Sequence, residues 1–115
     1  MTADAVSIHN AEHYTWGEVC DGWHLLSGAG LSVIEERMPA GGREQRHLHE
    51  RAQQFFYVLA GELTLELSDE TVILRAGEGM AIPVRVPHQA SNASALDVRF
   101  LVISQPPSHG DRIPA

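Results

Sequence analysis

Two histidines that are one residue apart open the segment HLHERAQQFFYVLAG, which covers residues 47 to 61. Positions i and i+2 of a β-strand point to the same face, so a strand here would hold the imidazoles of His47 and His49 side by side. Further along the chain, GEGMAIPVRVPHQASN supplies a third imidazole at His88, and Gln54 offers an amide oxygen. Three imidazoles and one oxygen donor suit one divalent transition metal ion, such as Zn, Fe, Ni, Mn or Co. From spacing alone, the alternative is that these residues lie unconnected on solvated loops.

The elements that would bring these residues together are short β-strands. Glycines and prolines divide the chain into short segments rich in branched or aromatic residues, which predicts an all-β sandwich or barrel. One helical turn is expected near residues 10 to 13, and the segment before His88 is expected to be a turn that leads into a strand. The other expected strands are residues 31–38, 54–59, 62–67, 71–74 and 97–104, with residues 68–70 forming a hairpin turn between two of them.

The strand that begins at Gln54 has two faces of different character. Gln54 and Phe56 share the face that would line a cavity, so Phe56 is a candidate for contact with a substrate. The opposite face carries Phe55, Tyr57 and Leu59. Three large apolar side chains require a cover, which would be a neighbouring sheet or a partner subunit.

Composition excludes several classes of partner. The 115 residues suffice for one domain with one core. A net charge of −7 and the absence of lysine argue against a nucleic-acid partner. Cys20 is the single cysteine, so a disulfide or a thiolate metal cluster within the chain is excluded. No segment approaches the roughly 18 apolar residues of a membrane span, and the first residues lack the pattern of a signal peptide. We therefore expect a cytoplasmic protein without membrane contact.

The chain resembles a small single-domain cupin, because both halves of that family's signature can be laid on it. The first half has a glycine, a His-x-His pair, an acidic residue and a second glycine, and these positions hold Gly41, His47, His49, Gln54 and Gly61. The second half is matched by Gly77, Pro83, His88 and Asn92, whereas Arg85 replaces its second glycine.

The resemblance implies an all-β cupin barrel, also called a double-stranded β-helix or jelly roll. It implies one domain over residues 1–115, with the motif region at 41–92, an N-terminal strand segment at 1–30 and a polar tail at 105–115 that is either mobile or folded over an opening. By analogy with the family, the metal ligands would be His47, His49, Gln54 and His88. Small cupins usually pair through sheet edges and exchange N-terminal strands, so a homodimer is expected.

Two departures from the family pattern bear on chemistry. Gln54 stands where the family has an acid, so a metal ion here would keep its full charge, which favours Lewis-acid work over redox cycling. The alternative is that Gln54 is a spectator, in a three-histidine site or in a barrel that has lost its metal. Arg85 is a candidate for binding a substrate carboxylate through its guanidinium, and the alternative is a solvated side chain on a turn.

These observations predict a metal-dependent enzyme that acts on a small oxygen-rich molecule by isomerase-like or lyase-like chemistry, for example on a sugar acid. The alternatives are an iron-dependent dioxygenase and a metallo-cupin that binds or senses a small molecule without turnover. The last of these is supported because the sequence reveals no obvious general acid or base near the ligands, so catalytic residues are not assigned. Glu35 and Arg37 share one strand face, as an ion pair or as polar groups of the pocket. His9, His13, His24 and His109 are expected to be surface or packing residues.

Overall fold

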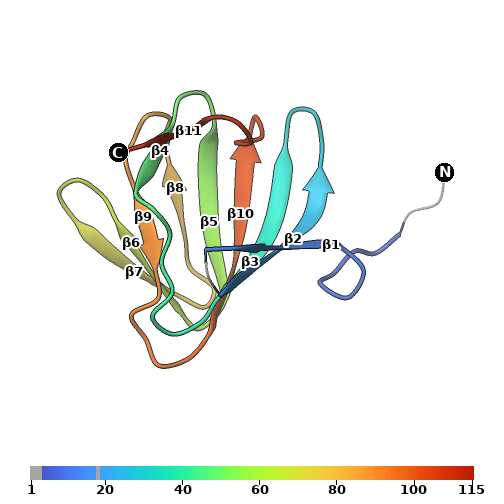
Figure 1. The fold of residues 1–115 in the computed structure, drawn as a ribbon, viewed down its shortest axis with the longest axis horizontal. Helices are drawn as coiled ribbons and strands as arrows, with labels where there is room; N and C mark the ends of the chain where they lie inside the picture. The colour runs from blue at the N-terminus through green and yellow to red at the C-terminus, as the bar shows by residue number, and fades with distance from the viewer. Residues whose placement is uncertain (1–3, 18) are drawn as a thin grey trace.

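The structure is a computed structural model that describes residues 4–17 and 19–115. In these residues the chain forms a series of short β-strands joined by turns (Figure 1). In chain order the strands are β1 (Glu12–Trp16), β2 (Cys20–Ser27), β3 (Ser32–Met38), β4 (His47–His49), β5 (Gln53–Ala60), β6 (Glu62–Glu66), β7 (Thr71–Arg75), β8 (Gly79–Ile82), β9 (Gln89–Ser91), β10 (Val98–Gln105) and β11 (Arg112–Pro114).

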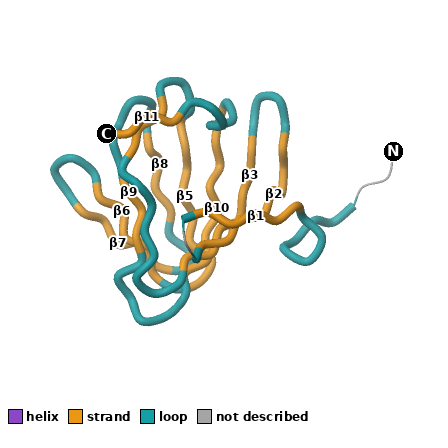
Figure 2. Tube along the Cα trace, viewed as in Figure 1, coloured by secondary structure: helices purple, strands orange, loops and turns teal. Residues whose placement is uncertain are grey.

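The strands form an antiparallel jelly-roll barrel. One sheet has the order β1-β2-β3-β10-β5-β8, a second has the order β7-β6-β9, and β4 pairs with β11. Figure 2 shows strands joined by loops and no helix in the part of the chain that the structure describes. No helix in that part is long and apolar enough to cross a membrane. The all-β prediction is thus confirmed.

The core lies between the two larger sheets. Leu63 and Leu65 on β6 and Val58 and Phe100 on β5 and β10 are fully buried in one hydrophobic cluster. The alternation of buried and less buried residues along β5, β6 and β10 places one face of each strand in this cluster. Apolar burial of this kind is the main stabilising term of a small domain, and here it holds the barrel walls around the space that contains the histidines.

Most of the expected strands are present with ends shifted by about one residue. Residues 68–70 form the predicted turn between β6 and β7, with the Leu67 N–H donating to the Glu70 carbonyl (2.8 Å). One expectation was wrong and one was incomplete. Near residues 10 to 13 the chain forms an isolated turn, in which the N–H of Ala11 donates to the Ser7 carbonyl (2.9 Å), and then enters β1, because β1 pairs with β2. A turn before His88 leads towards β9 as expected, but the segment ahead of this turn also contains a strand, β8, which pairs with β5 along the sheet edge.

The outer face of β5 is open in the single chain. Phe55, Tyr57 and Leu59 are 40%, 36% and 38% exposed, whereas Gln54 and Phe56 on the other face are buried. The predicted two faces of this strand are therefore confirmed, and no segment of the described chain covers the apolar one.

The C-terminal residues close over one end of the barrel. β11 pairs with β4, the strand that carries the two neighbouring histidines, and crosses the upper end of the barrel in Figure 1. The carboxylate of Asp111 accepts the backbone N–H groups of Glu50, Arg51 and Ala52 (3.1, 3.0 and 2.9 Å). Of the two possibilities for the polar tail, the folded one is observed.

Candidate metal centre

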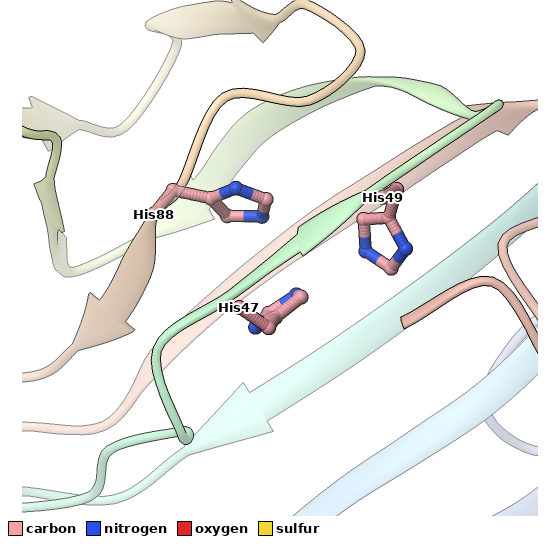
Figure 3. A group of neighbouring side chains, drawn as sticks. All are labelled: His47, His49 and His88. Atoms are coloured by element: carbon pink, nitrogen blue, oxygen red, sulfur yellow. The ribbon is translucent and has the colours of Figure 1, made fainter. Parts of the chain in front are cut away.

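Three histidines from separate parts of the chain meet inside the barrel. His47 and His49 are on β4, and His88 directly precedes β9. The backbones of His47 and His88 exchange two hydrogen bonds (3.0 and 2.9 Å), which fixes the two segments next to each other. One ring nitrogen of each of the three residues lies within 4.8 Å of the other two, and Figure 3 shows the rings grouped around a common space. The meeting of the three histidines expected from the sequence is observed.

The backbone orients two of these rings. The Nδ1 of His47 bonds the Gln45 carbonyl (2.8 Å), and the Nδ1 of His88 bonds the Val86 carbonyl (2.9 Å). A carbonyl oxygen can only accept, so Nδ1 carries the proton in both rings and Nε2 keeps its lone pair. Such a contact is the usual way in which a protein presents an imidazole to a metal ion.

Burial keeps the cluster neutral. Burial lowers the pKa of His47 to about 4. It also lowers the pKa values of His49 and His88, and the positive charge of Arg112 acts in the same direction on all three rings. Neutral imidazoles are the form that binds metal, so the site needs no deprotonation at neutral pH.

Gln54 presents an oxygen to the same cavity. Its Nε2 donates to the Ser104 Oγ on β10 (3.0 Å), which turns its Oε1 the other way. Three buried side-chain atoms of the described residues have no hydrogen-bond partner, namely His49 Nδ1, Gln54 Oε1 and His88 Nε2. A buried acceptor without a partner is costly. A divalent ion would give all three atoms a partner, so the residues fit the metal that this type of site implies.

A cavity of about 260 Å³, which we name the inner cavity, adjoins the histidine cluster. Its lining residues are Tyr14, Ile34, Glu36, Glu44, His47, His49, Gln54, Phe56, Val102, Ser108, His109, Gly110 and Arg112. A second cavity of about 580 Å³, which we name the outer cavity, adjoins the inner one. The two share the lining residues Tyr14, Ile34, Ser108, His109 and Arg112. Together they provide space for a ligand larger than the inner cavity alone could hold.

The inner cavity contains titratable groups that the sequence did not reveal. Burial and the charge of Glu44 raise the pKa of Glu36 to about 8, against the opposing effects of the Tyr14 hydroxyl and of Arg112. Burial raises the pKa of Glu44 to about 7. Both carboxyl groups share a cavity with His47 and His49, so titratable groups that the sequence did not indicate lie near the histidines.

The sequence contains two successive acidic residues, Glu35 and Glu36, on the strand that borders the cavity. Glu35 and Arg37 share one face of this strand as predicted, but it is the outer face, and they pair with other residues and not with each other. Glu35 pairs with Arg99 (3.0 Å), and Arg37 bonds Asp21 (2.7 Å). In a strand with acids at two successive positions, one of them must face inward, but the sequence alone does not say which one.

The two candidate substrate contacts have different positions. Phe56 is buried and lines the inner cavity. Arg85 is exposed and does not line either cavity. Its φ of 64° is a conformation that glycine adopts more easily, which explains why the family pattern has glycine there. Arg85 contacts the site through its backbone, since its N–H donates to the His49 carbonyl (2.7 Å).

Two of the histidines that were predicted to be surface or packing residues line a cavity. His24 lines the outer cavity, and His109 lines both. His13 lies on the outside, where its Nε2 bonds Asp21 (2.8 Å). His109 reaches the cavities because the C-terminal residues fold over the barrel end, which no local sequence pattern indicates.

The jelly-roll barrel and its cluster of three inward-facing histidines place the protein among small β-barrel proteins with a candidate metal-binding site. The sequence profile described as the cupin domain matches residues 34–104, which contain all three histidines and Gln54. The chain therefore belongs to the cupin family.

Two curated relatives match part of the chain. An uncharacterized protein, MJ1618, of Methanocaldococcus jannaschii is 28% identical over 89 residues, which are 76% of this chain and 71% of the relative. The polyketide synthase CurC of Streptomyces cyaneus is 33% identical over 72 residues, which are 63% of this chain and 44% of the relative. The match thus spans less than half of CurC.

Solved structures share the fold. The polyketide cyclase RemF of Streptomyces resistomycificus superposes with a TM-score of 0.84 at 20% identity, over 99% of this chain and 86% of RemF. A cupin of Silicibacter pomeroyi described as a sugar phosphate isomerase superposes with a TM-score of 0.77 at 20% identity, over 87% of this chain and 74% of the other. At this level of identity, the similarity shows the fold alone.

Proposed function

We propose that this protein is a metal-dependent enzyme that acts on a small, oxygen-rich molecule by isomerase-like or lyase-like chemistry. The observation that carries the proposal is the set of buried, unpartnered acceptors on His49, Gln54 and His88, which surround one site together with His47. In this proposal His47, His49, Gln54 and His88 hold one divalent transition metal ion, which supplies Lewis-acid polarisation of a substrate oxygen when bound.

The residues of the cavity suit an oxygen-rich and anionic molecule. Arg112 lines the cavity, where its guanidinium can donate hydrogen bonds to a carboxylate or another anionic oxygen group. Phe56 offers an apolar surface for the carbon skeleton. Ser108, His109, Gly110 and Arg112 of the C-terminal segment also line this cavity. A sugar acid combines these features, which makes this class our first choice.

A second candidate substrate is a polyketide-like chain or ring system. CurC and RemF are named as a polyketide synthase and a polyketide cyclase, and the outer cavity of about 580 Å³ provides room for a larger molecule. Both classes of substrate carry several carbonyl or hydroxyl oxygens, and neither needs a redox-active metal for isomerisation or ring closure.

The test compares metal forms and substrate classes. The protein is loaded with Zn or with Fe(II), and each form is incubated with panels of sugar acids, sugar phosphates and polyketones while products and oxygen are followed. We expect turnover by the Zn form without oxygen uptake. Oxygen uptake by the Fe(II) form with an inactive Zn form would assign the protein to the dioxygenases. Binding without turnover by either form would assign it to the sensing proteins.

A further inference from the structure

Three residues form a row across three neighbouring strands. Tyr14 on β1 pairs with Gly22 on β2, and Gly22 pairs with Glu36 on β3. The Tyr14 hydroxyl donates to the Oε2 of Glu36 (3.2 Å), which means that the phenol reaches over the strand between them. The hydrogen bond uses one carboxyl oxygen of Glu36 and leaves the other available to a ligand.

Gly22 makes this reach possible. A Cβ atom at this position would lie 2.2 Å from the Cζ and 2.5 Å from the hydroxyl oxygen of Tyr14. Contacts this short do not occur, so any other residue at position 22 would displace the ring. A glycine inside a strand weakens the strand, and close approach of another group is one of the reasons for such a glycine. Here the group is the ring of Tyr14.

The row ends inside the cavity of the histidine cluster. Glu36 and Tyr14 line the inner cavity together with His47, His49 and Gln54. The Oε1 of Gln54 on β5 and the Nδ1 of His49 on β4 belong to residues that line the same cavity, and both atoms are buried without a hydrogen-bond partner, so they can bind a ligand. Glu36 therefore faces the space in which a molecule held at the histidines would lie.

The two other glutamates near the cavity are held by different partners. The Oε2 of Glu44 accepts the backbone N–H of Ala90 (2.9 Å). Glu35 is on the outer face of β3, where it pairs with Arg99. Glu36 differs from both, because its Oε2 accepts a hydrogen bond from the hydroxyl of Tyr14, which lines the same cavity.

We propose that Glu36 is the catalytic acid–base residue of this cavity, and that Tyr14, placed by Gly22, is its positioning residue. The proposal deepens the proposed function and rests on it. The substrate is an α-hydroxy carbonyl or a β-dicarbonyl compound, because both have a C–H bond next to a carbonyl group.

The reaction step involves only a proton and the electron pair that it leaves. The ionised carboxylate of Glu36 takes the proton from the carbon, the C–H pair forms a C=C bond, and the carbonyl π pair moves to the oxygen. As the oxygen pair re-forms the carbonyl, the C=C pair takes a proton from the protonated Glu36 at the same carbon, so the net change is exchange of the C–H hydrogen with solvent. The step needs no oxidant or reductant. A carboxyl group whose pKa is raised to about 8 can act in both directions near neutral pH.

The experiment uses zinc-loaded wild type and the variants Glu36→Gln, Tyr14→Phe and Gly22→Ala. Glu35→Gln is the matched control, because it changes the adjacent carboxyl group on the opposite face of the same strand. The probes are dihydroxyacetone, an α-hydroxy ketone, and acetylacetone, a β-dicarbonyl compound, in deuterated water, with deuterium uptake followed by NMR against the spontaneous rate. Elemental analysis of zinc and the infrared band of a protonated carboxyl group at neutral pH serve as readouts that do not depend on turnover.

We expect wild type and Glu35→Gln to exchange at least one probe, and Glu36→Gln to be slower by about 10²-fold or more, with zinc content unchanged. The infrared band should be strong in wild type and weaker in Glu36→Gln, where Glu44, with its pKa raised to about 7, accounts for what remains. Loss of the Tyr14 hydroxyl removes a donor that favours the ionised carboxylate, so the pH midpoint of exchange should rise in Tyr14→Phe. Gly22→Ala, which displaces the Tyr14 ring, should also raise the pH midpoint of exchange.

Two results would overturn the proposal in different ways. Exchange by Glu36→Gln at the wild-type rate, or an infrared spectrum without the Glu36 band, would show that another group moves the proton, and the proposed function would stand. If wild type exchanges none of the probes, the proposed function fails and the proton-transfer role of Glu36 fails with it.

Discussion

The carboxylate of Asp111 accepts the backbone N–H of Ala52 at 2.9 Å, and this contact joins the C-terminal residues to the loop that follows His49. The same carboxylate accepts the N–H groups of Glu50 and Arg51. Because β11 begins at the next residue and pairs with β4, the contact also fixes the strand that carries His47 and His49. The geometry of the histidine cluster thus depends on residues more than 50 positions away in the sequence.

Replacement of Asp111 should loosen both the fold and the cluster. In Asp111→Ala, three backbone N–H groups lose their acceptor, so the Tm should fall and the zinc affinity should fall with it. Asp111→Asn keeps one acceptor oxygen and should lie between the alanine variant and wild type. Thermal unfolding with and without zinc measures both effects. A stable Asp111→Ala variant with full zinc affinity would show that the C-terminal residues do not support the site.

Metal content should depend on the clustered histidines and not on the others. We expect about one divalent ion per chain in wild type, and at least tenfold weaker binding in His47→Ala and in His88→Ala, because each change removes a ligand. His13→Ala is the control, since His13 bonds Asp21 on the outer face. Elemental analysis of protein purified without a histidine tag checks the prediction. Full metal retention in both cluster variants would place the metal elsewhere.

The sequence was sufficient for the barrel and for the histidines because both follow from local patterns. Alternating apolar residues set the strands on both sides of the core, as for Leu63 and Leu65 on β6. The pair His47 and His49 follows from the two-residue repeat of a strand, and the spacing of His88 follows the family signature. Gln54 and Phe56 were placed on the inner face for the same reason, and both line the cavity.

The rest of the cavity depends on long-range packing that no local pattern encodes. Arg112 and His109 enter the wall because the C-terminal residues fold back over the barrel. Glu36 accepts a hydrogen bond from the hydroxyl of Tyr14, whose side chain reaches from β1 over Gly22 on β2. The exposed position of Arg85 depends on a turn whose φ of 64° is unusual for arginine. Such features require the register between strands, which the sequence alone leaves open.

A homodimer is expected from the open apolar face of β5. Phe55, Tyr57 and Leu59 are exposed together, and a patch of this kind usually marks an interface. Light scattering at micromolar concentration should report twice the chain mass of 12.6 kDa. Tyr57→Glu should shift the protein toward the monomer, because a charge would be buried without a partner. Leu96→Glu is the control, since Leu96 is 75% exposed on a loop. A 12.6 kDa wild-type species would contradict the dimer.

The stability of the protein should fall from weakly acidic to alkaline pH because of Glu36. Its pKa is raised from 4.5 to about 8 on folding, so the folded state binds more protons than the unfolded state between these pH values. The stabilisation is present at low pH and is lost as the pH rises through about 8. The groups that face Glu36 are Tyr14 on β1, Glu44 before β4 and Arg112 on β11.

Glu36→Gln should therefore flatten this part of the stability curve. The amide cannot ionise, so the Tm of the variant should decline less than that of wild type between pH 6 and about 9, with the remaining slope due to Glu44. Glu35→Gln should keep the wild-type slope. Thermal unfolding monitored by circular dichroism at several pH values makes the comparison. Parallel curves for wild type and Glu36→Gln would mean that Glu36 is ionised in the folded protein.

Gln54→Glu distinguishes Lewis-acid chemistry from oxygen chemistry. A carboxylate is a stronger donor than an amide, so the variant should keep its zinc or bind it more tightly. The added negative charge lowers the Lewis acidity of the ion, so isomerase-like or lyase-like activity of the zinc form should fall. The loss of the Gln54 Nε2 bond to Ser104 is matched by Ser104→Ala, which removes this contact without adding a charge.

The comparison is made with both metals. Wild type, Gln54→Glu and Ser104→Ala are loaded with Zn and with Fe(II), and product formation and oxygen consumption are measured side by side. Lower zinc-dependent turnover in Gln54→Glu than in Ser104→Ala, at equal metal content, would assign the effect to charge. A carboxylate helps to stabilise oxidised iron, so a dioxygenase would respond in the opposite sense, with higher oxygen consumption in the iron form of Gln54→Glu. That outcome would replace the Lewis-acid assignment of the site.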